Sequence, residues 1–543
     1  MRTYPSWPNL AAMMFALARD RADRPVLRAY RGNEWSSITW DAFGREAAAA
    51  ARALRQAGVK AGDRVVIASE NRPEYPIAET ALMALRAVPV PAYVTNTVAD
   101  HAHILRDSGA IAAIVSSAAL AGRLREAASR TDGIDLLVVM DGPQEAAGGR
   151  PRLLPWSQLI ADANTPADDV AREAAGITAD TLACLIYTSG TGGAPKGVML
   201  PHRSILSNCA GAFALLRGMG LHDEVYLSYL PAAHSFEHTV GQFFFPSLGT
   251  EIVYARGVEH LAADMLTVRP TLLTAVPRVL EVIRARVLGQ IAREPAWRRG
   301  LFERALATGL KRLDGERLTL GERIADPVLD RLVRAKLQAR FGGRLKGVVS
   351  GGARLEPEVG RFFLAMGVRL LQGYGQTEAG PVISANPPFA IRIGTVGKPL
   401  EGVELSIADD NEVLVRGDLV MAGYWNRPEE TAAVIRDGWL HTGDIGTLDN
   451  DGYLTLTDRK RDIIVLSGGE NVSPAKIEAM LMAESEIAQA VVVGDGRAGL
   501  VGLVVPADRQ DDVSVALAVS RVNMRLSVAE RIRKHAVVAP FTV

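Results

Sequence analysis

The chain has 543 residues, too many for one compact core, and roughly two to four structural units are expected. Apolar residues make up 48% and charged residues 22%, a composition that excludes collagen-like, mucin-like and wholly disordered chains. The 61 Lys and Arg residues balance the 61 Asp and Glu residues, and this neutrality argues against a dedicated nucleic-acid binder.

The cellular compartment of the protein is indicated by three features that the sequence lacks. Two cysteines, Cys184 and Cys209, cannot build a disulfide framework, which favours a reducing compartment. The first 30 residues do not combine a basic end with the apolar run of a signal peptide. No segment reaches the ~18 uninterrupted apolar residues of a membrane span. We therefore expect a cytoplasmic protein.

The first half of the chain alternates short β-branched runs with helical stretches. Strands are predicted at residues 64–68, 111–116 and 136–140, later at 182–187, 225–230, 251–254 and 272–276, and helices at 76–87 and 101–107. The run 88–93 is expected to be extended, because proline disfavours helix in the preceding residue. This alternation predicts α/β units around a largely parallel sheet.

The segment 278–346 interrupts this pattern and is helix-rich. It holds 17 Lys and Arg residues against 8 Asp and Glu residues, a local excess of nine positive charges in a neutral chain. One interpretation is an ordinary solvated helical face. The other is a surface that meets an anionic partner, such as phospholipid or a phosphorylated ligand.

After residues 345–350 the chain becomes β-rich, with strand-like alternation at 412–416 and 453–456. A charged run, 458–462 (DRKRD), follows between apolar strands and predicts a domain boundary. The remainder is expected to be a small α+β unit, with strands at 463–466, 490–493 and 502–505 and helices at 474–483 and 512–526. The predicted domains are residues 1–458 and 459–543.

The strongest chemical signal is the run Tyr187 to Gly197 (YTSGTGGAPKG), which follows the apolar strand 182–186. Glycines let several N–H groups converge on one anion, hydroxyls add donors, and lysine adds a positive charge. The spacing of a Walker loop is absent, because Pro195 stands where such a loop would open its helix. The pattern favours a phosphate-binding loop, and the alternative is a flexible surface loop.

Five segments in order resemble the adenylate-forming superfamily of acyl-CoA synthetases, luciferases and peptide-synthetase adenylation domains. They are the glycine loop, Ser350 to Ala353 (SGGA), Gln372 to Glu378 (QGYGQTE), Gly438 to Asp444 (GWLHTGD), and Asp458 to Asp462 with 467–471 (SGGEN). The loop departs from the family at Gly192, where a hydroxyl residue is usual. The resemblance implies an acyl-CoA synthetase-like α/β fold, with a large N-terminal region of α/β subdomains and a small mobile C-terminal α+β domain.

The resemblance also implies roles for individual residues. Thr188, Ser189, Gly190, Thr191 and Lys196 would hold the β- and γ-phosphates of ATP, and Gly351, Gly352 and Ala353 would form the adenine-side turn. Tyr374 would stack on adenine, Thr377 would contact the α-phosphate, and Glu378 would help to hold Mg²⁺. Asp444 would accept both ribose hydroxyls, Arg459 would reach the ribose or phosphate side, and Lys460 would be the hinge.

His234 lies in the segment 230–238 (LPAAHSFEH). A single histidine in apolar surroundings is usually a satisfied core residue. The segment resembles the family's Leu-Pro-x-x-His stretch, which lies by the acyl carboxylate and the thiol path, so His234 is a candidate catalytic residue. Glu237 and His238 are weaker candidates.

The resemblance is strongest to AMP-forming long-chain fatty acid–CoA ligases, because a long insertion, about 284–344, separates the His234 segment from the Tyr374 segment. This implies lipid metabolism, with a fatty acid, ATP and coenzyme A as substrates. The basic excess of the insertion fits either of two roles. It could hold the protein peripherally on the anionic surface of the inner membrane, or it could bind the phosphates of coenzyme A. A homodimer is compatible with the resemblance, and no nucleic acid is expected.

Residues 531–543 resemble the family's closing strand, which relatives continue into a stretch with a catalytic lysine. The given sequence stops before that lysine, and Lys534 precedes the strand, so we expect thioester formation to be retained better than adenylation. Two alternatives stay open beside the coenzyme A ligase: an acyl-AMP ligase that loads a carrier protein, and an adenylation-deficient homologue that binds acyl-adenylate.

Overall fold

The computed structural model describes residues 4–142, 151–188, 194–460, 464–467, 471–495, 497–507, 511–526, 528 and 530–541. Contacts divide the chain into two compact units, one of Met1–Glu404 with Val415–Leu440 and the other of Leu405–Leu414 with His441–Val543. The contact-based division therefore falls earlier than residue 459, and the domain boundary predicted there stays a prediction. Each unit is described by itself.

The larger unit is built on a nine-stranded sheet with the order β16-β15-β14-β13-β12-β10-β11-β1-β2. The six strands from β14 to β1 run parallel, and the three edge strands are antiparallel to their neighbours. The strands are β1 (Pro25–Arg31), β2 (Glu34–Thr39), β10 (Val225–Ser228), β11 (Glu251–Tyr254), β12 (Leu272–Ala275), β13 (Gly347–Ser350), β14 (Leu370–Gly375), β15 (Val382–Ala385) and β16 (Lys398–Pro399). This confirms the predicted parallel sheet.

Apolar faces of several helices cover this sheet, because parallel strands must be buried on both faces. Leu280, Leu337 and Phe363, from three of these helices, join Val348 of β13 in one buried cluster. The helices between β9 and β15 are α8 (His202–Leu216), α9 (Phe245–Ser247), α10 (Leu261–Val268), α11 (Pro277–Ala292), α12 (Ala296–Leu313), α13 (Leu320–Leu329), α14 (Ala335–Arg340) and α15 (Pro357–Ala365). Short 3-10 and π-helical turns join them: η1 (Arg217–Met219), η2 (Glu237–Phe244), η3 (Val258–His260), η4 (Asp330–Arg334) and η5 (Thr377–Ala379).

A second, five-stranded parallel sheet has the order β4-β3-β5-β6-β7. Its strands are β3 (Arg64–Ala68), β4 (Val88–Ala92), β5 (Ala112–Ser117), β6 (Leu136–Asp141) and β7 (Arg152–Pro155). Pro89 and Pro91 lack the N–H group that an inner strand needs, which explains why β4 is an edge strand. The strands predicted at 64–68, 111–116 and 136–140 are confirmed.

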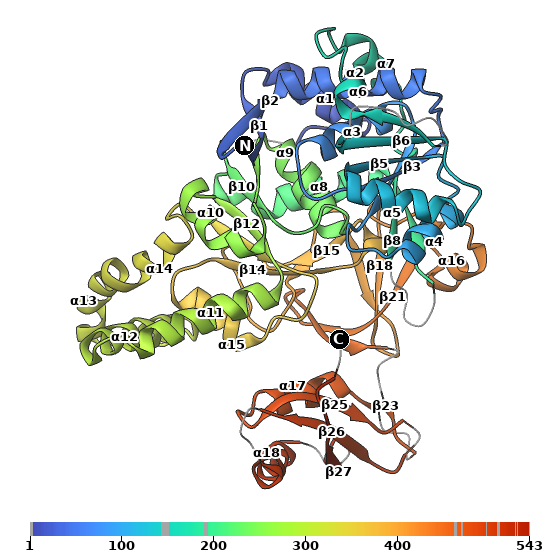
Figure 1. Cartoon of the computed structure of the whole chain (residues 1–543). Coiled ribbons are helices and arrows are strands. Elements are labelled where there is room, and N and C mark those ends of the chain that lie inside the picture. The colour runs from blue at the N-terminus through green and yellow to red at the C-terminus, as the bar shows by residue number, and fades with distance from the viewer. Residues whose placement is uncertain are drawn as a thin grey trace. The chain divides into compact units, whose positions relative to one another are not determined.

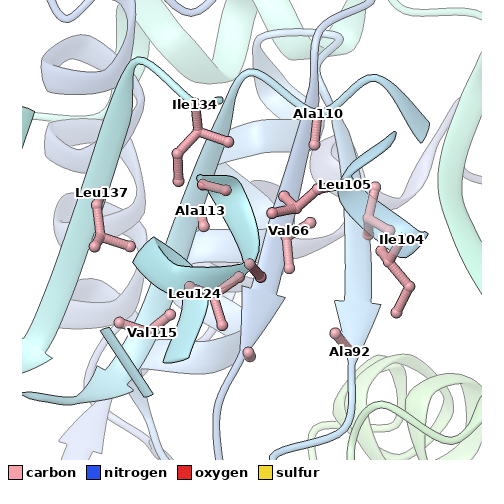
Figure 2. Packing of buried hydrophobic residues seen from close by; sticks show 14 of the residues in the cluster. Val66, Ala92, Ile104, Leu105, Ala110, Ala113, Val115, Leu124, Ile134 and Leu137 are labelled. Atoms are coloured by element: carbon pink, nitrogen blue, oxygen red, sulfur yellow. The ribbon is translucent and has the colours of Figure 1, made fainter. Parts of the chain in front are cut away.

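Helices α4 (Val98–Ser108) and α5 (Ala118–Ala128) pack on this second sheet. Figure 2 shows part of the resulting core, with Leu105 of α4 and Leu124 of α5 among side chains of the strands, such as Val66 and Ala113. Thr97 and Asp100 form a capping box that fixes the start of α4. The predicted helix at 101–107 is thus part of a longer one.

The first 60 residues contain elements that were not predicted: α1 (Leu10–Asp20), the hairpin β1–β2, and α2 (Trp40–Gln56). Helix α2 buries Ala47 to Ala51, and charged residues such as Arg45 and Arg52 lie on its less buried side. Three more helices follow later in the chain: α3 (Glu74–Ala84), which corresponds to the helix predicted at 76–87, α6 (Trp156–Leu159) and α7 (Asp168–Ala175).

The predicted helix-rich segment is confirmed as α11 to α14, and Figure 1 shows these helices extending from one side of the larger unit. A small antiparallel sheet, β19-β9-β8, comprises β8 (Leu182–Thr188), β9 (Lys196–Pro201) and β19 (Gly423–Tyr424). Leu185 and Tyr187 of β8 belong to the buried cluster of the second sheet, and this contact positions the end of β8.

Another sheet has the order β17-β18-β21-β20, with β22 paired to β21, and the division between the units falls within the strands β17, β18 and β21. It comprises β17 (Glu404–Ile407), β18 (Glu412–Arg416), β20 (Ile435–Arg436), β21 (Trp439–Leu448) and β22 (Leu454–Arg459), and α16 (Pro428–Val434) precedes β20. The smaller unit continues with β23 (Ile464–Val465), β24 (Asn471–Val472), α17 (Pro474–Met482), β25 (Ile487–Val493), β26 (Leu500–Pro506), α18 (Asp512–Met524) and β27 (Ile532–Val537).

The smaller unit has a core of its own. Ile477 of α17, Val504 of β26 and Val519 of α18 are buried together in one apolar cluster. This confirms the small α+β unit predicted after the charged run. Among the described residues of the whole chain, no helix is long and apolar enough to cross a membrane.

Candidate active site

The predicted phosphate loop is the connection of the hairpin β8–β9. Thr188, the last residue of β8, pairs with Lys196, the first residue of β9. Both therefore lie where the loop leaves and re-enters the sheet. Ser189, Gly190 and Thr191 fall outside the described residues. Hairpin pairing brings two of the predicted phosphate ligands together although eight positions separate them.

Lys196 is engaged by two side chains that the sequence analysis did not identify. Its ammonium group forms an ion pair with Glu430 of α16 and lies 5.1 Å from the ring centre of Tyr424 in β19. The Lys196 side chain is 25% exposed, so the ammonium group is only partly withdrawn from solvent. Strand β19 reaches Lys196 because it pairs with β9, with Tyr424 opposite Val198.

Tyr424 also connects Lys196 to Glu378. Its hydroxyl donates a hydrogen bond of 2.8 Å to Oε1 of Glu378, which lies in η5 and is half-buried. The backbone N–H of Met421 donates to the Glu378 carbonyl at 2.9 Å. The predicted phosphate lysine and the predicted magnesium carboxylate thus share one aromatic neighbour. Nothing in the sequence near position 424 indicates this connection.

A chain of polar contacts continues from Glu430 to the strand before the loop. Glu430 pairs with Arg427 at 3.2 Å, and Arg427 pairs with Asp107 at 3.4 Å. Asp107 accepts a hydrogen bond of 2.7 Å from the hydroxyl of Tyr187, and burial together with this bond raises the pKa of Tyr187. The contacts fix both sides of the phosphate loop to α4 and α16.

Tyr374 lies at the carboxyl end of β14, and Thr377 follows in η5. Tyr374 pairs with Ser384 of β15. A Cβ atom at Gly375 would lie 1.8 Å from the carbonyl oxygen of Pro381, so only glycine fits there. The hydroxyl of Thr377 donates a hydrogen bond of 2.9 Å to the hydroxyl of Ser235, next to His234.

The His234 segment follows β10, and the predicted adenine-side turn, Gly351 to Ala353, follows β13. A Cβ atom at Gly351 would lie 3.5 Å from the ring of Phe236, and Gly352 has a φ of +82°, which favours glycine. Segments after β10, β13 and β14 therefore meet at the carboxyl ends of parallel strands, where α/β sheets usually bind ligands.

His234 itself is exposed, and its Nδ1 accepts a hydrogen bond of 3.2 Å from the N–H of Phe236. Enough protein still surrounds the imidazole for partial desolvation to lower its pKa. A neutral, solvent-accessible imidazole beside Thr377 is compatible with the predicted position near the reacting groups. Its catalytic role stays a prediction.

Glu237 and His238 point into the interior. Both are fully buried, in the π-helix η2. Glu237 accepts hydrogen bonds from Tyr226 at 2.5 Å, Ser228 at 2.6 Å and Thr274 at 3.3 Å, and burial raises its pKa to about 7. His238 contacts Glu79 at 2.6 Å. These contacts tie η2 to β10, β12 and α3, and a catalytic role for either residue stays a prediction.

The smaller unit carries Asp444, Arg459 and Lys460. Asp444 is buried in β21 and pairs with Arg459 of β22, whose Nε lies 3.4 Å from its Oδ1. Lys460 pairs with Asp410 at 2.5 Å and Glu412 at 2.9 Å, and these hydrogen bonds raise its pKa. The structure brings these three predicted residues together around the end of β22.

A metal site of three or more His, Cys, Asp or Glu side chains is absent from the described ranges. Within these ranges, Glu378 forms no ion pair, and its carboxylate receives one hydrogen bond, from Tyr424. Its charge is therefore free to face a cation. Magnesium is commonly held by one or two carboxylates with substrate phosphates and water, so this arrangement fits Mg²⁺.

Comparisons with known proteins agree with these features. Residues 15–425 match the family model "AMP-binding enzyme", and residues 461–542 match "AMP-binding enzyme C-terminal domain". The long-chain-fatty-acid–CoA ligase FadD15 of Mycobacterium tuberculosis is 35% identical over 494 residues, covering 90% of this chain and 80% of that protein. The long-chain-fatty-acid–[acyl-carrier-protein] ligase AEE15 of Arabidopsis thaliana is 27% identical, covering 92% and 76%.

Solved structures of lower identity share the fold. A benzoate CoA ligase from Burkholderia xenovorans superposes with a TM-score of 0.74 at 23% identity, over 98% of this chain and 96% of that one. The o-succinylbenzoate coenzyme A synthetase of Bacillus subtilis, in complex with ATP and magnesium ion, gives a TM-score of 0.71 at 20% identity, over 97% and 95%. These similarities confirm the predicted fold class.

Proposed function

Because the chain belongs to the AMP-binding enzyme family and is an adenylate-forming acid–thiol ligase, we propose that it activates a long-chain fatty acid and transfers it to coenzyme A. The observation that carries this proposal is the 35% identity to FadD15 over 90% of the chain. The four-helix insertion α11 to α14, between the His234 and Tyr374 segments, supports the long-chain assignment.

In the proposed first step, a carboxylate oxygen of the acid attacks the α-phosphorus of ATP, and the bond to pyrophosphate breaks. Both reactants are anions, so their approach requires positive charge and hydrogen-bond donors. Lys196 and Thr188 would supply these to the β- and γ-phosphates, together with Ser189, Gly190 and Thr191. Thr377 would donate to the α-phosphate by turning toward it the O–H that points to Ser235 in this structure.

Glu378 would hold Mg²⁺, which neutralises phosphate charge when bound. Tyr374 and the turn Gly351 to Ala353 would receive adenine, and Asp444 and Arg459 would contact the ribose. Exposed His234 would lie toward the acyl carboxylate. In the second step the thiolate of coenzyme A attacks the acyl carbonyl, AMP leaves with the bonding electrons, and the thiol proton passes to solvent.

A carrier protein is the second candidate for the thiol acceptor. The similarity to the acyl-carrier-protein ligase AEE15 supports it, although at lower identity than FadD15. Both candidates share the adenylation step and differ only in what removes the acyl group from AMP. A homodimer stays a prediction from the resemblance.

Pyrophosphate release tests the proposal directly. The full chain is incubated with ATP, Mg²⁺ and fatty acids of increasing length, with and without coenzyme A, and both pyrophosphate and thioester are measured. Release that grows with acyl length, together with CoA thioester, is the expected result. Acid-dependent release without thioester would favour the carrier-protein candidate, and absence of turnover with every acid would contradict ligase activity.

A further inference from the structure

Helix α13 and the following turn η4 expose a row of apolar residues to solvent. Leu320, Ile324 and Val328 of α13 and Leu332 of η4 follow one another every four residues, and their exposed fractions are 74%, 70%, 53% and 43%. Residues four apart lie on the same side of a helix. The four side chains, here called the α13 row, therefore form a ridge about 18 Å long, at 1.5 Å per residue.

The acidic residues of α13 face inward instead. Glu322 completes a capping box with Thr319 and receives a hydrogen bond of 2.6 Å from Lys311 of α12. The Asp326 side chain is 1% exposed and pairs with Arg334 at 2.9 Å and with Arg312. A surface helix normally turns its apolar stripe toward the core. Helix α13 buries Leu329 but turns Leu320, Ile324 and Val328 toward solvent.

The buried side chain of Arg334 holds this orientation in place. Besides Asp326, its guanidinium donates to the carbonyl of Ala305 at 2.6 Å, the hydroxyl of Thr308 at 2.8 Å and the carbonyl of Ala365 at 3.1 Å. Rotating α13 to bury its apolar row would leave Arg334 and Asp326 without partners in the interior, which is costly. The outward apolar row is thus a fixed feature of the fold.

The charges beside the α13 row are basic. Arg323, Arg331 and Lys336 are exposed, and none of them forms an ion pair with a described residue. Asp330, which adjoins Arg331 in the sequence, is paired with Arg334. Ion pairs within residues 278–346 engage the acids of the segment and leave its net basic excess unchanged, and part of that excess lies beside the apolar row.

We propose that the α13 row, with Arg323 and Arg331, docks this protein on the surface of an anionic lipid bilayer. Helices of this kind insert apolar side chains at the boundary between headgroups and acyl chains, while basic side chains contact lipid phosphates. A row of four side chains is small beside the roughly 1,200 Å² that a stable protein–protein interface buries. The basic charges and the small size of the row therefore favour a membrane over a protein partner.

Vesicle sedimentation tests this proposal with the full chain, at low and high salt. The vesicles contain phosphatidylcholine alone, or phosphatidylcholine with one quarter phosphatidylglycerol. Binding is expected to the anionic vesicles only and to fall at high salt. Arg323→Gln with Arg331→Gln is expected to raise the half-saturating lipid concentration about tenfold or more, because each basic residue near such a surface contributes appreciably.

The contribution of the apolar side chains to vesicle binding is tested by Ile324→Ser with Val328→Ser. This variant should weaken binding to anionic vesicles by about fivefold to tenfold, since the apolar area buried in the bilayer is lost. Val258→Ser with Leu266→Ser is the matched control, because these residues are 63% and 57% exposed outside α13. Arg125→Gln with Arg172→Gln, both exposed, is the control for charge. Neither control should change binding.

Equal binding to neutral vesicles, or equal loss in the control variants, would overturn the proposal. Self-association of the wild type that Ile324→Ser with Val328→Ser abolishes, measured by sedimentation velocity, would assign the row to a second copy of the chain instead. Pyrophosphate release with a water-soluble acid should be unchanged in all four variants, so the membrane proposal and the proposed ligase function can fail independently.

Discussion

The ammonium group of Lys196 contacts the carboxylate of Glu430 and the ring of Tyr424, and both contacts affect how strongly it can bind phosphate. The ion pair with Glu430 neutralises its charge, while the Tyr424 ring holds the ammonium group above its face. Phosphate oxygens would have to compete with Glu430 for Lys196. Removal of the lysine and removal of its partner should therefore have opposite effects on ATP binding.

Lys196→Ala is expected to raise the KM for ATP about 10- to 100-fold, because a hydrogen bond to a charged group contributes roughly 1.5–3 kcal/mol. The measurement is pyrophosphate release as a function of ATP concentration. Exposed Lys60→Ala is the control. An unchanged KM would remove Lys196 from the phosphate site.

Glu430→Gln should lower the KM for ATP, by no more than about fivefold, since partly exposed ion pairs contribute roughly 0.2–1 kcal/mol. The neighbouring, exposed Glu429→Gln is the matched control and should have no effect. A raised KM in Glu430→Gln would mean that this acid positions the lysine rather than competing with ATP.

Glu378→Gln should raise the Mg²⁺ concentration needed for half-maximal adenylation by about tenfold or more, because a site with few protein ligands loses its anionic oxygen. Tyr424→Phe removes only the hydroxyl that donates to Glu378, and a neutral hydrogen bond contributes about 1 kcal/mol, so a few-fold increase is expected. Magnesium titrations at saturating ATP measure both. If neither variant changes the titration, Glu378 does not hold the cation.

The π-helix η2 is the element that joins the His234 segment to the interior. Glu237 links it to β10 and β12 through Tyr226, Ser228 and Thr274, and His238 links it to α3 through Glu79. Wide helical turns of this kind often occur at functional sites. Here the turn places a titratable carboxyl group in a fully buried position.

Protonation of the buried Glu237 carboxyl group should make the free energy of unfolding depend on pH. Its pKa of about 7 lies above the ordinary value of 4.5 for a glutamate, so between these pH values the folded state binds a proton that the unfolded state has released. Stability should therefore decrease as pH rises from 4.5 to 7, by roughly 3 kcal/mol in total. Glu237→Gln carries no such proton and should flatten this dependence.

Urea unfolding at several pH values between 4.5 and 8 measures the effect. The exposed Glu303→Gln is the control and should keep the wild-type slope. Parallel curves for the wild type and Glu237→Gln would show that Glu237 is ionised in the folded protein throughout this range.

The whole molecule consists of two compact units, and the proposed reaction assigns residues from both of them to ATP. Lys196, Thr377 and Glu378 belong to the larger unit, while Asp444 and Arg459 belong to the smaller one. Lys460, the predicted hinge, groups with the smaller unit by its contacts, and the C-terminal family model begins at residue 461. The hinge stays a prediction.

Lys460→Pro is expected to slow thioester formation from supplied acyl-adenylate and coenzyme A. Proline fixes φ near −65° and removes the N–H that donates to the Gly443 carbonyl at 2.8 Å. Lys460→Met keeps that N–H and loses only the pairs with Asp410 and Glu412, so it serves as the control. Equal rates in wild type and Lys460→Pro would show that no backbone rotation at this position is needed.

Features formed by residues close together along the chain could be predicted from the sequence. The runs at 187–197 and 372–378 each hold their own glycines, hydroxyls and charged groups, so their chemistry could be read locally. Alternating β-branched and helical runs predicted most strands of the five-stranded sheet and β10, β11 and β12 of the nine-stranded sheet. Helix α2 was not predicted, although its alanines are buried and charged residues occupy its other side.

Contacts between residues far apart in the sequence became known from the folded structure. Tyr424 and Glu430 contact Lys196 because β19 pairs with β9, across more than two hundred positions. The apolar row of α13 could be taken for a core face in the sequence, and the buried pairing of Asp326 with Arg334 turns it outward. Side-chain environments of this kind depend on contacts between remote segments, for which the local sequence carries no signal.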